Sequence, residues 1–217
     1  MPHHDHHDRL DHESEQASDP HEPHQIGLFV FEGVEELDAV GPWEVLACWT
    51  QQHPEDGWRV SCVSADGAPV GGAKGLTLGA HHGFADAPPW EVFIHPGGPG
   101  ARRLLRDPAH LKRIRRLRAS VPVMAAVCSG SLVYAAAGLL SRRRATTHWA
   151  SLNALSELDP TIVTEVDARF VDDGDLVTSA GVSAGIDMSL HLVARLAGVE
   201  RAREIRRELQ YDPRPPY

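Results

Sequence analysis

Short apolar runs of strand length recur along the chain, and each ends in a break rich in glycine, proline or small polar residues. These runs are residues 26–31, 58–64, 91–96 and 121–127, and a shorter run at 76–78 is predicted to be an edge strand. Such runs are typical of strands buried on both faces of a parallel sheet. Residues 168–179 alternate in polarity around a central Asp-Gly pair, which predicts a β-hairpin.

Segments with helical spacing of apolar residues separate these strands. The predicted helices are residues 35–52, the segment that follows Asp107-Pro108, residues 131–140 and residues 185–198. Asp107 suits an N-cap, Pro108 a first turn, and Gly198 a helix end. Gly41-Pro42 predicts an irregular first turn in the first helix. Strands that alternate with helices predict an α/β fold, with a doubly wound, mostly parallel sheet and helices on both faces.

Charge separates an N-terminal tail from the rest of the chain. The 217 residues carry a net charge of −9, but residues 1–24 hold seven Asp or Glu and one Arg, which leaves only −3 for the remainder. The same tail contains seven of the 14 histidines. Such a polar segment cannot bury enough apolar surface to offset its ordering entropy. We therefore predict a disordered tail at 1–24 and one domain at 25–217. The tail's His and Asp side chains could chelate a transition metal, but a solvating role is the simpler interpretation.

Composition also excludes several classes of protein. No run of about 18 apolar residues suggests a membrane span, and the tail lacks the apolar middle of a secretory signal. The three cysteines contain no CxxC pair, so neither a disulfide scaffold nor a zinc ribbon is indicated. A cytoplasmic protein without membrane partners is expected. The arginines of the helix after Pro108 favour a solvated surface over a nucleic-acid site.

One cysteine stands where a strand gives way to a helix. Ligands of doubly wound sheets bind beyond the carboxyl ends of the strands, which is where Cys128 is placed. Ala126 and Gly130, two residues to either side, permit a sharp turn of the nucleophile-elbow kind. The positive potential of the following helix N-terminus is expected to lower the pKa of the thiol. Cys128 is thus a candidate nucleophile, whereas Cys48 and Cys62 are assigned to the core.

A glycine loop and an acid are predicted at the same edge of the sheet. Gly97 and Gly98 follow the strand 91–96, and glycines there let backbone N–H groups approach a ligand and stabilise developing negative charge. Asp38 follows the first strand, and a carboxyl in an apolar cleft has a raised pKa suited to proton transfer. From the residues alone, both features have plainer interpretations: a Gly/Pro turn, and a charge favoured by a helix dipole.

These motifs, taken in order, resemble a known superfamily. VCSGSLVYAAAGLL together with RATTHW is similar to the signature of the ThiJ/PfpI superfamily, which is related to the class I glutamine amidotransferases. More narrowly, FEGVEELDAVGPWEVL, HPGGPG, AGIDMSL and ELQYDPRPPY resemble segments of the isonitrile hydratases. The likeness spans residues 26–217. It implies a flavodoxin-like fold and a homodimer.

The resemblance also implies the site residues. Cys128 corresponds to the nucleophile, Asp38 to its acidic partner, and Ser129 to the hydroxyl residue after the nucleophile, which is typically threonine in hydratases. Gly97 and Gly98 correspond to the oxyanion-type loop. His148 matches the superfamily histidine near the nucleophile and is not expected to be essential; a structural histidine remains an equal interpretation. The expected activity is hydration of a small-molecule isonitrile to an N-substituted formamide, with no metal or other cofactor.

Three other functions share parts of this pattern. A ligand- or redox-sensing protein is one, because AraC-type regulators carry a similar amino-terminal half; the helix-turn-helix region that follows it there is not expected here, since the chain ends at Tyr217. A PfpI-like peptidase expects histidine directly after the nucleophile, where Ser129 stands. A glyoxalase- or deglycase-like enzyme usually has glutamate at the place of Asp38. The hydratase is the interpretation we favour.

Overall fold

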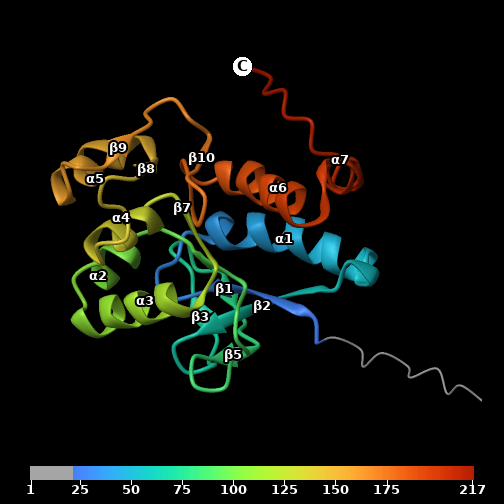
Figure 1. Cartoon of the computed structure of the whole chain (residues 1–217), viewed down its shortest axis with the longest axis horizontal. Coiled ribbons are helices and arrows are strands. Elements are labelled where there is room, and N and C mark those ends of the chain that lie inside the picture. The colour runs from blue at the N-terminus through green and yellow to red at the C-terminus, as the bar shows by residue number, and fades with distance from the viewer. Residues whose placement is uncertain (1–21) are drawn as a thin grey trace, which may run out of the picture.

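The computed structural model of the protein describes residues 22–217. Its centre is a seven-stranded sheet with the order β10-β11-β7-β6-β1-β2-β5 (Figure 1). The strands are β1 His24–Phe29, β2 Trp58–Ser64, β5 His82–Gly83, β6 Val92–His95, β7 Val123–Val127, β10 Phe170–Asp172 and β11 Leu176–Ser179. All neighbouring strands run parallel except the β10–β11 hairpin. The predicted mostly parallel sheet and the predicted hairpin are confirmed.

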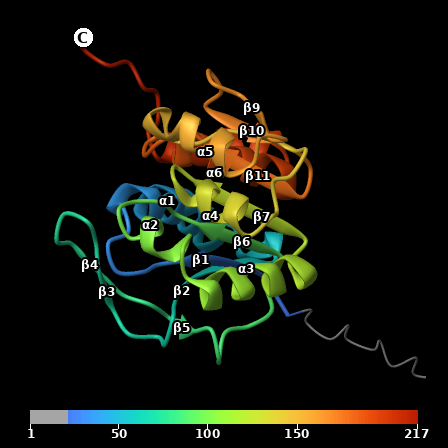
Figure 2. The same ribbon diagram turned by 90° about the vertical axis from the view of Figure 1, so that its left-hand side faces the viewer.

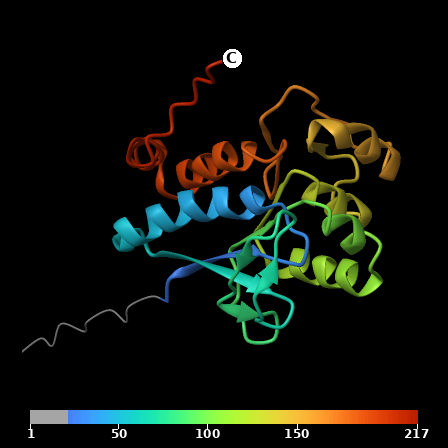
Figure 3. The same cartoon turned by 180° about the vertical axis from the view of Figure 1, so that it is seen from behind.

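Helices cover both faces of this sheet. They are α1 Glu36–Gln52, α2 Ala101–Leu104, α3 Pro108–Ser120, α4 Gly130–Ala136, α5 Leu152–Leu158, α6 Ala184–Ala197 and α7 Val199–Glu208. The chain passes from β1 through α1 to β2 in one direction along the sheet and from β6 through α3 to β7 in the other. Right-handed crossovers therefore put α1 and α3 on opposite faces. α6 packs beside α1, and α4 packs against α3 (Figure 3). The doubly wound arrangement is confirmed.

The short connecting elements depart from the sequence expectation. β4 (Thr77–Leu78) does not join the main sheet: it pairs with β3 (Val70–Gly71) in a hairpin that projects from the body (Figure 2). A turn between Gly72 and Gly75 folds this segment back on itself, so the edge of the main sheet is formed by β5 instead. The prediction of an edge strand at 76–78 is therefore wrong. A second small pair joins β8 (Arg144–Ala145) to β9 (Val163–Thr164).

Helix ends also differ in detail from the predictions. Asp107 caps α3 as expected, since its side chain accepts a hydrogen bond from the backbone N–H of Ala109. α1 is continuous from Glu36 with Pro42 inside it, so its first turn is not irregular. α4 ends at Ala136, before Gly138, whose φ of 83° is left-handed. α7 and two 3₁₀ turns, at Pro54–Asp56 and Trp149–Ser151, had no sequence signal that we interpreted.

The core lies on both faces of the central strands. Its large, fully buried side chains include Phe29 of β1, Trp49 of α1, Phe93 of β6, Met124 of β7 and Tyr134 of α4. Most of the predicted tail lies outside the described residues, and β1 begins at its last residue, His24. Among residues 22–217 no helix is long and apolar enough to cross a membrane.

A buried histidine pair supports the end of β6. His95 and His110 are 0% and 2% exposed, and their Nε2 atoms are 3.0 Å apart. His95 Nδ1 lies 2.7 Å from the Pro96 carbonyl oxygen, so Nδ1 carries the proton and His110 must donate to His95 through Nε2. Burial lowers the pKa of His95 to about 3 and that of His110 to about 4. Both rings are therefore neutral at ordinary pH.

We predict that this pair makes the fold sensitive to acid. Free histidine has a pKa of about 6.5, so between about pH 6.5 and 4 the unfolded chain binds protons that the folded pair does not, and stability falls as the pH is lowered. His110→Leu alone should cost about 1–3 kcal/mol, because His95 loses its partner. Urea unfolding curves recorded from pH 8 to 5 give the free energy of unfolding at each pH. In the double variant His95→Val/His110→Leu this free energy should fall less steeply toward acid than in the wild type. An unchanged pH slope in that variant would contradict the assignment.

Candidate active site

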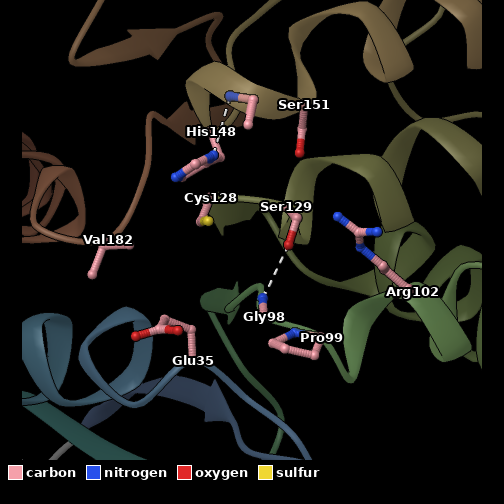
Figure 4. Close-up of a pocket in the computed structure, with 10 residues that line it drawn as sticks. Glu35, Gly98, Pro99, Arg102, Cys128, Ser129, His148, Ser151 and Val182 are labelled. Atoms are coloured by element: carbon pink, nitrogen blue, oxygen red, sulfur yellow. Dashed lines mark hydrogen bonds between the residues drawn. The ribbon is translucent and has the colours of Figure 1, made fainter. Parts of the chain in front are cut away.

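Four loops meet at the carboxyl edge of the sheet. The strand order reverses between β1 and β6, and such a switch point opens a crevice beyond the strand ends. α1, which follows β1, brings Asp38; the loop after β6 brings Gly97 and Gly98; the turn after β7 brings Cys128; and the loop after β11 brings Val182. Figure 4 shows Cys128, Ser129, Gly98, His148 and Val182 around one space. The segments that follow these strands thus meet at the carboxyl edge of the sheet, as the sequence predicted.

Cys128 is held in a left-handed backbone conformation. Its φ is 56°, and a non-glycine residue in this region carries strain of roughly 1–2 kcal/mol. Its N–H donates to the carbonyl oxygens of Ser179 and Ala180, both at 3.3 Å. Its carbonyl oxygen accepts from Thr147 Oγ1 at 2.9 Å and from Ser131 Oγ at 3.0 Å. These bonds from β11, α4 and the segment after β8 hold the sharp turn, and the side chain is 6% exposed.

Asp38 lies in the first turn of α1 and is fully buried. Oδ2 accepts a hydrogen bond of 2.9 Å from the Gly97 N–H. Oδ1 has no hydrogen-bond partner of ordinary geometry among the described residues, although the Cys128 thiol is close enough to lower the pKa of the carboxyl. Burial outweighs both donors and raises the pKa of Asp38 to about 7. The carboxyl can therefore either give or take a proton near neutral pH.

The thiol of Cys128 does not have the lowered pKa that the sequence suggested. Burial first, and then the charge of Asp38, raise its pKa to about 12. The backbone N–H groups of Ser129 and Val182 act in the opposite direction on the sulfur but do not prevail. The sequence argument considered the following helix, yet α4 has only seven residues. The expectation of a low thiol pKa is wrong for the free protein, and its cause is desolvation beside a carboxylate.

The Gly97–Gly98 loop holds the acid and the hydroxyl in place. The Gly97 N–H is occupied by Asp38, and the Gly98 N–H donates to Ser129 Oγ at 3.0 Å. A Cβ at 97 would lie 2.5 Å from the Ser129 backbone nitrogen, and one at 98 would lie 2.2 Å from that of Glu35. Gly98 also has a φ of 112°. Only glycine permits this approach, and both N–H groups that we expected to face a ligand are engaged within the protein.

A cavity of about 450 Å³ lies where these segments meet α2 and the 3₁₀ turn at Trp149–Ser151. It is lined by Glu35, Gly98, Pro99, Arg102, Cys128, Ser129, His148, Ala150, Ser151 and Val182 (Figure 4). Asp38 and Gly97 lie buried behind this lining, so the structure brings together all six residues singled out from the sequence. His148 Nδ1 accepts from the Ala150 N–H at 3.2 Å, which leaves Nε2 to carry the ring proton. No described residues form a cluster of three His, Cys, Asp or Glu that suits a metal ion.

The lining contains six residues that were not among the predicted site residues: Glu35, Pro99, Arg102, Ala150, Ser151 and Val182. Val182 has a left-handed φ of 48° and follows β11. The rule that ligands bind beyond the carboxyl ends of the strands, which pointed to Cys128, therefore applied to Val182 as well. Glu35 lies three residues before Asp38 and forms an ion pair with Lys74 of the β3–β4 hairpin. Arg102 and Ser151 had no signal in the sequence, because tertiary packing brings them to the cavity: α2 packs against α4, and the 3₁₀ turn packs against α5, which contacts α4.

Several known proteins are similar to this chain in sequence or in fold. The isonitrile hydratase of Pseudomonas putida is 39% identical over 193 residues, which cover 89% of this chain and 81% of that enzyme. The HTH-type transcriptional regulator CdhR of Pseudomonas aeruginosa is 32% identical over 151 residues, which cover 69% of this chain but only 44% of the regulator. The crystal structure of a ThiJ/PfpI family protein from Pseudomonas syringae has a TM-score of 0.81 at 29% identity, over 96% of this chain and 86% of that one.

The family assignment rests on more than single relatives. The sequence model of the DJ-1/PfpI family matches residues 24–195, which run from the start of β1 nearly to the end of α6. The matched region therefore contains every strand of the central sheet and every loop of the cavity. This chain belongs to the DJ-1/PfpI family.

Proposed function

We propose that this protein hydrates isonitriles, R–N≡C, to N-substituted formamides, R–NH–CHO, by covalent catalysis at Cys128. The observation that carries the proposal is the fully buried Asp38 carboxyl, whose pKa of about 7 suits proton exchange next to a thiol at the wall of a cavity. The 39% identity to the Pseudomonas putida isonitrile hydratase supports the same activity. The direct test is to incubate the protein with cyclohexyl isocyanide and to look for the formamide by mass spectrometry.

In the first step the thiol adds to the terminal carbon of the isonitrile. Because the pKa of Cys128 is about 12, the thiol must lose its proton as it attacks. Asp38 in its acid form gives a proton to the isonitrile carbon and receives the thiol proton in exchange. Oδ1, which Gly97 leaves free, is the oxygen that carries it. The product is the thioimidate R–N=CH–S–Cys128, and Asp38 is again protonated.

In the second step water releases the product. Asp38 protonates the imine nitrogen and takes a proton from the water whose oxygen adds to the carbon, which gives R–NH–CH(OH)–S–Cys128. The C–S bond then breaks, the hydroxyl proton returns to sulfur through Asp38, and R–NH–CHO leaves. Ser129 assists at the nitrogen: its Oγ already accepts from Gly98, so its own O–H proton is left to be donated into the cavity.

A sensing role is the second candidate, because the regulator CdhR shares 32% identity with this chain. Peroxide-sensing cysteines have a low pKa and are accessible to solvent. Cys128 has a pKa raised to about 12 and is 6% exposed, and both properties favour the enzyme. Rapid oxidation of Cys128 by peroxide, together with no turnover of any isonitrile, would reverse this preference.

The proposal also covers the oligomeric state, the location and the partners of the protein. We propose a homodimer that acts in the cytoplasm on a small molecule, without cofactor, nucleic-acid or membrane partners. Light scattering coupled to size-exclusion chromatography tests the dimer, and dialysis against a chelator, with no loss of turnover, tests the independence from metal.

Cys128→Ala is predicted to lower kcat by at least about 10³-fold, because the substitution removes the nucleophile. The fold should be retained, since the backbone bonds of residue 128 do not involve its side chain. Cys48→Ala and Cys62→Ala serve as controls: each should keep its turnover while losing about 1–2 kcal/mol of stability. Normal turnover in folded Cys128→Ala would rule out covalent catalysis.

Asp38→Asn is predicted to lower kcat by at least about 10²-fold, because the amide keeps the shape but cannot exchange the proton. Loss of the carboxylate should at the same time lower the pKa of Cys128, since the charge of Asp38 is one of the causes that raise it. Alkylation of Cys128 by iodoacetamide, followed on its tryptic peptide, should therefore become faster at pH 8. Slower alkylation in a folded variant would show that Asp38 activates the thiol.

The pH profile should report the acid form of Asp38. Its pKa is raised to about 7, so kcat/KM should be constant below that pH and fall by about tenfold per unit above it. The residual activity of Asp38→Asn should lack this break. Steady-state rates between pH 5.5 and 9 measure both profiles, and a rate that rises through pH 7 would assign the carboxylate, rather than the acid, to the first step.

A further inference from the structure

Arg102 is a cation at the wall of the catalytic cavity that has no partner among the described residues. It lies in α2, is exposed, and lines the cavity together with Cys128 and Ser129. Figure 4 shows its guanidinium group directed from α2 toward Ser129 and Ser151. No acceptor among residues 22–217 receives a hydrogen bond or ion pair from this group. Its neighbour Arg103 differs, because it donates to the carbonyl oxygen of Glu32 at 2.9 Å.

A second cavity adjoins the first at Arg102. This cavity, of about 350 Å³, is lined by Arg102, Leu105, Arg106, Leu132, Ala150, Ser151, Ala154, Glu157 and Leu158. Arg102, Ala150 and Ser151 line both spaces, so the two cavities are neighbours and Arg102 lies at the junction between them; below, the two together are called the channel. The apolar side chains of Leu105, which follows α2, and of α4 and α5 suit an alkyl chain. The hydroxyl of Ser151 adds a polar group, since it makes no hydrogen bond with another described residue.

The other charges of the channel do not cancel Arg102. Glu35 lies across the first cavity but pairs with Lys74, and Asp38 is buried with a pKa near 7. Among the described residues, Glu157 is the one carboxylate that lines the second cavity, against two arginines, Arg102 and Arg106, and it forms no hydrogen bond or ion pair with either. An anion brought into the channel therefore meets an excess of positive charge at the junction.

We propose that the natural isonitrile carries a carboxylate on its R group and that Arg102 binds this carboxylate. The inference rests on the proposed hydratase activity, because it names the substrate class of the same site. A guanidinium binds a carboxylate through two parallel N–H···O bonds, which fixes both the charge and the orientation of the ligand. The isonitrile carbon then lies at Cys128, the R chain bends past Ser129, and the carboxylate lies at the junction within reach of the Ser151 hydroxyl. Hydration leaves the carboxylate unchanged, so the product is an N-formyl amino acid.

The test compares isocyano-carboxylates with their uncharged primary amides, from isocyanoacetate to isocyanohexanoate. The wild-type protein should prefer the carboxylate in kcat/KM by about tenfold or more at the best chain length, as expected for a charged hydrogen-bonded pair. Arg102→Met keeps the apolar stem and removes the charge, and it should abolish this preference, mainly through KM. Arg115→Met is the matched control, because Arg115 is an exposed arginine of α3 that lines neither cavity. It should keep the preference.

A second readout does not depend on hydration. Iodoacetate and iodoacetamide both alkylate Cys128 and differ mainly in charge, so the ratio of their rates reports the attraction of an anion to the site. Arg102→Met should lower this ratio severalfold, and Arg115→Met should not. If amides and carboxylates are hydrated equally by wild type and Arg102→Met, the inference is overturned while the hydratase stands. If no isonitrile is hydrated, the proposed function fails, and an alkylation ratio that Arg102→Met leaves unchanged overturns the anion site as well.

Discussion

The burial of one carboxyl group sets the arrangement of the whole site. Asp38 is fully buried, and a buried acid is stable only where donors meet it or where it keeps its proton. Gly97 supplies a donor, which draws the loop after β6 onto the start of α1. The same loop reaches Ser129 through Gly98, so the segments after β1, β6 and β7 are held by two hydrogen bonds. Neither position tolerates a Cβ, because a Cβ at Gly97 would lie 2.5 Å from the Ser129 backbone nitrogen and one at Gly98 would lie 2.2 Å from that of Glu35.

The buried Asp38 and the strained Cys128 both lower the stability of the fold. Above pH 7 the folded protein must ionise Asp38 in an apolar setting, whereas the unfolded chain ionises it at about pH 3.9 without penalty. The raised folded pKa means that the contribution of Asp38 to stability is lost as the pH rises through about 7. Cys128 adds backbone strain at the adjacent turn. Destabilising features that cluster in one cavity are expected at a functional site, and here both belong to residues proposed to react.

The periodicity of the sequence predicts the strands, the helices and the edge of the sheet at which the site lies. It does not predict how closely the loops at that edge approach one another. The strands, the 168–179 hairpin and the meeting of Asp38, Gly97 and Cys128 at one edge follow from patterns along the chain, because a parallel sheet aligns its carboxyl ends. The direction of the Cys128 pKa does not follow, since it depends on how deeply the sulfur is buried and on the side chain beside it. The same is true of the N–H groups of Gly97 and Gly98, which turned out to hold protein side chains.

The protonation state of the cysteine at rest distinguishes the proposed enzyme from a sensor on this fold. A sensing thiol must be a thiolate at rest, which requires more positive than negative potential at sulfur. Here the N–H groups of Ser129 and Val182 supply some positive potential, but burial and Asp38 oppose it and the thiol stays protonated. In the proposed mechanism the protonated thiol and the neighbouring acid, with a pKa of about 7, move two protons in one step. Addition of S–H across an isonitrile needs that movement, because the carbon gains a proton as the sulfur loses one. In the proposed mechanism the buried pair Asp38–Cys128 therefore keeps the thiol protonated at rest and supplies both proton transfers when an isonitrile adds.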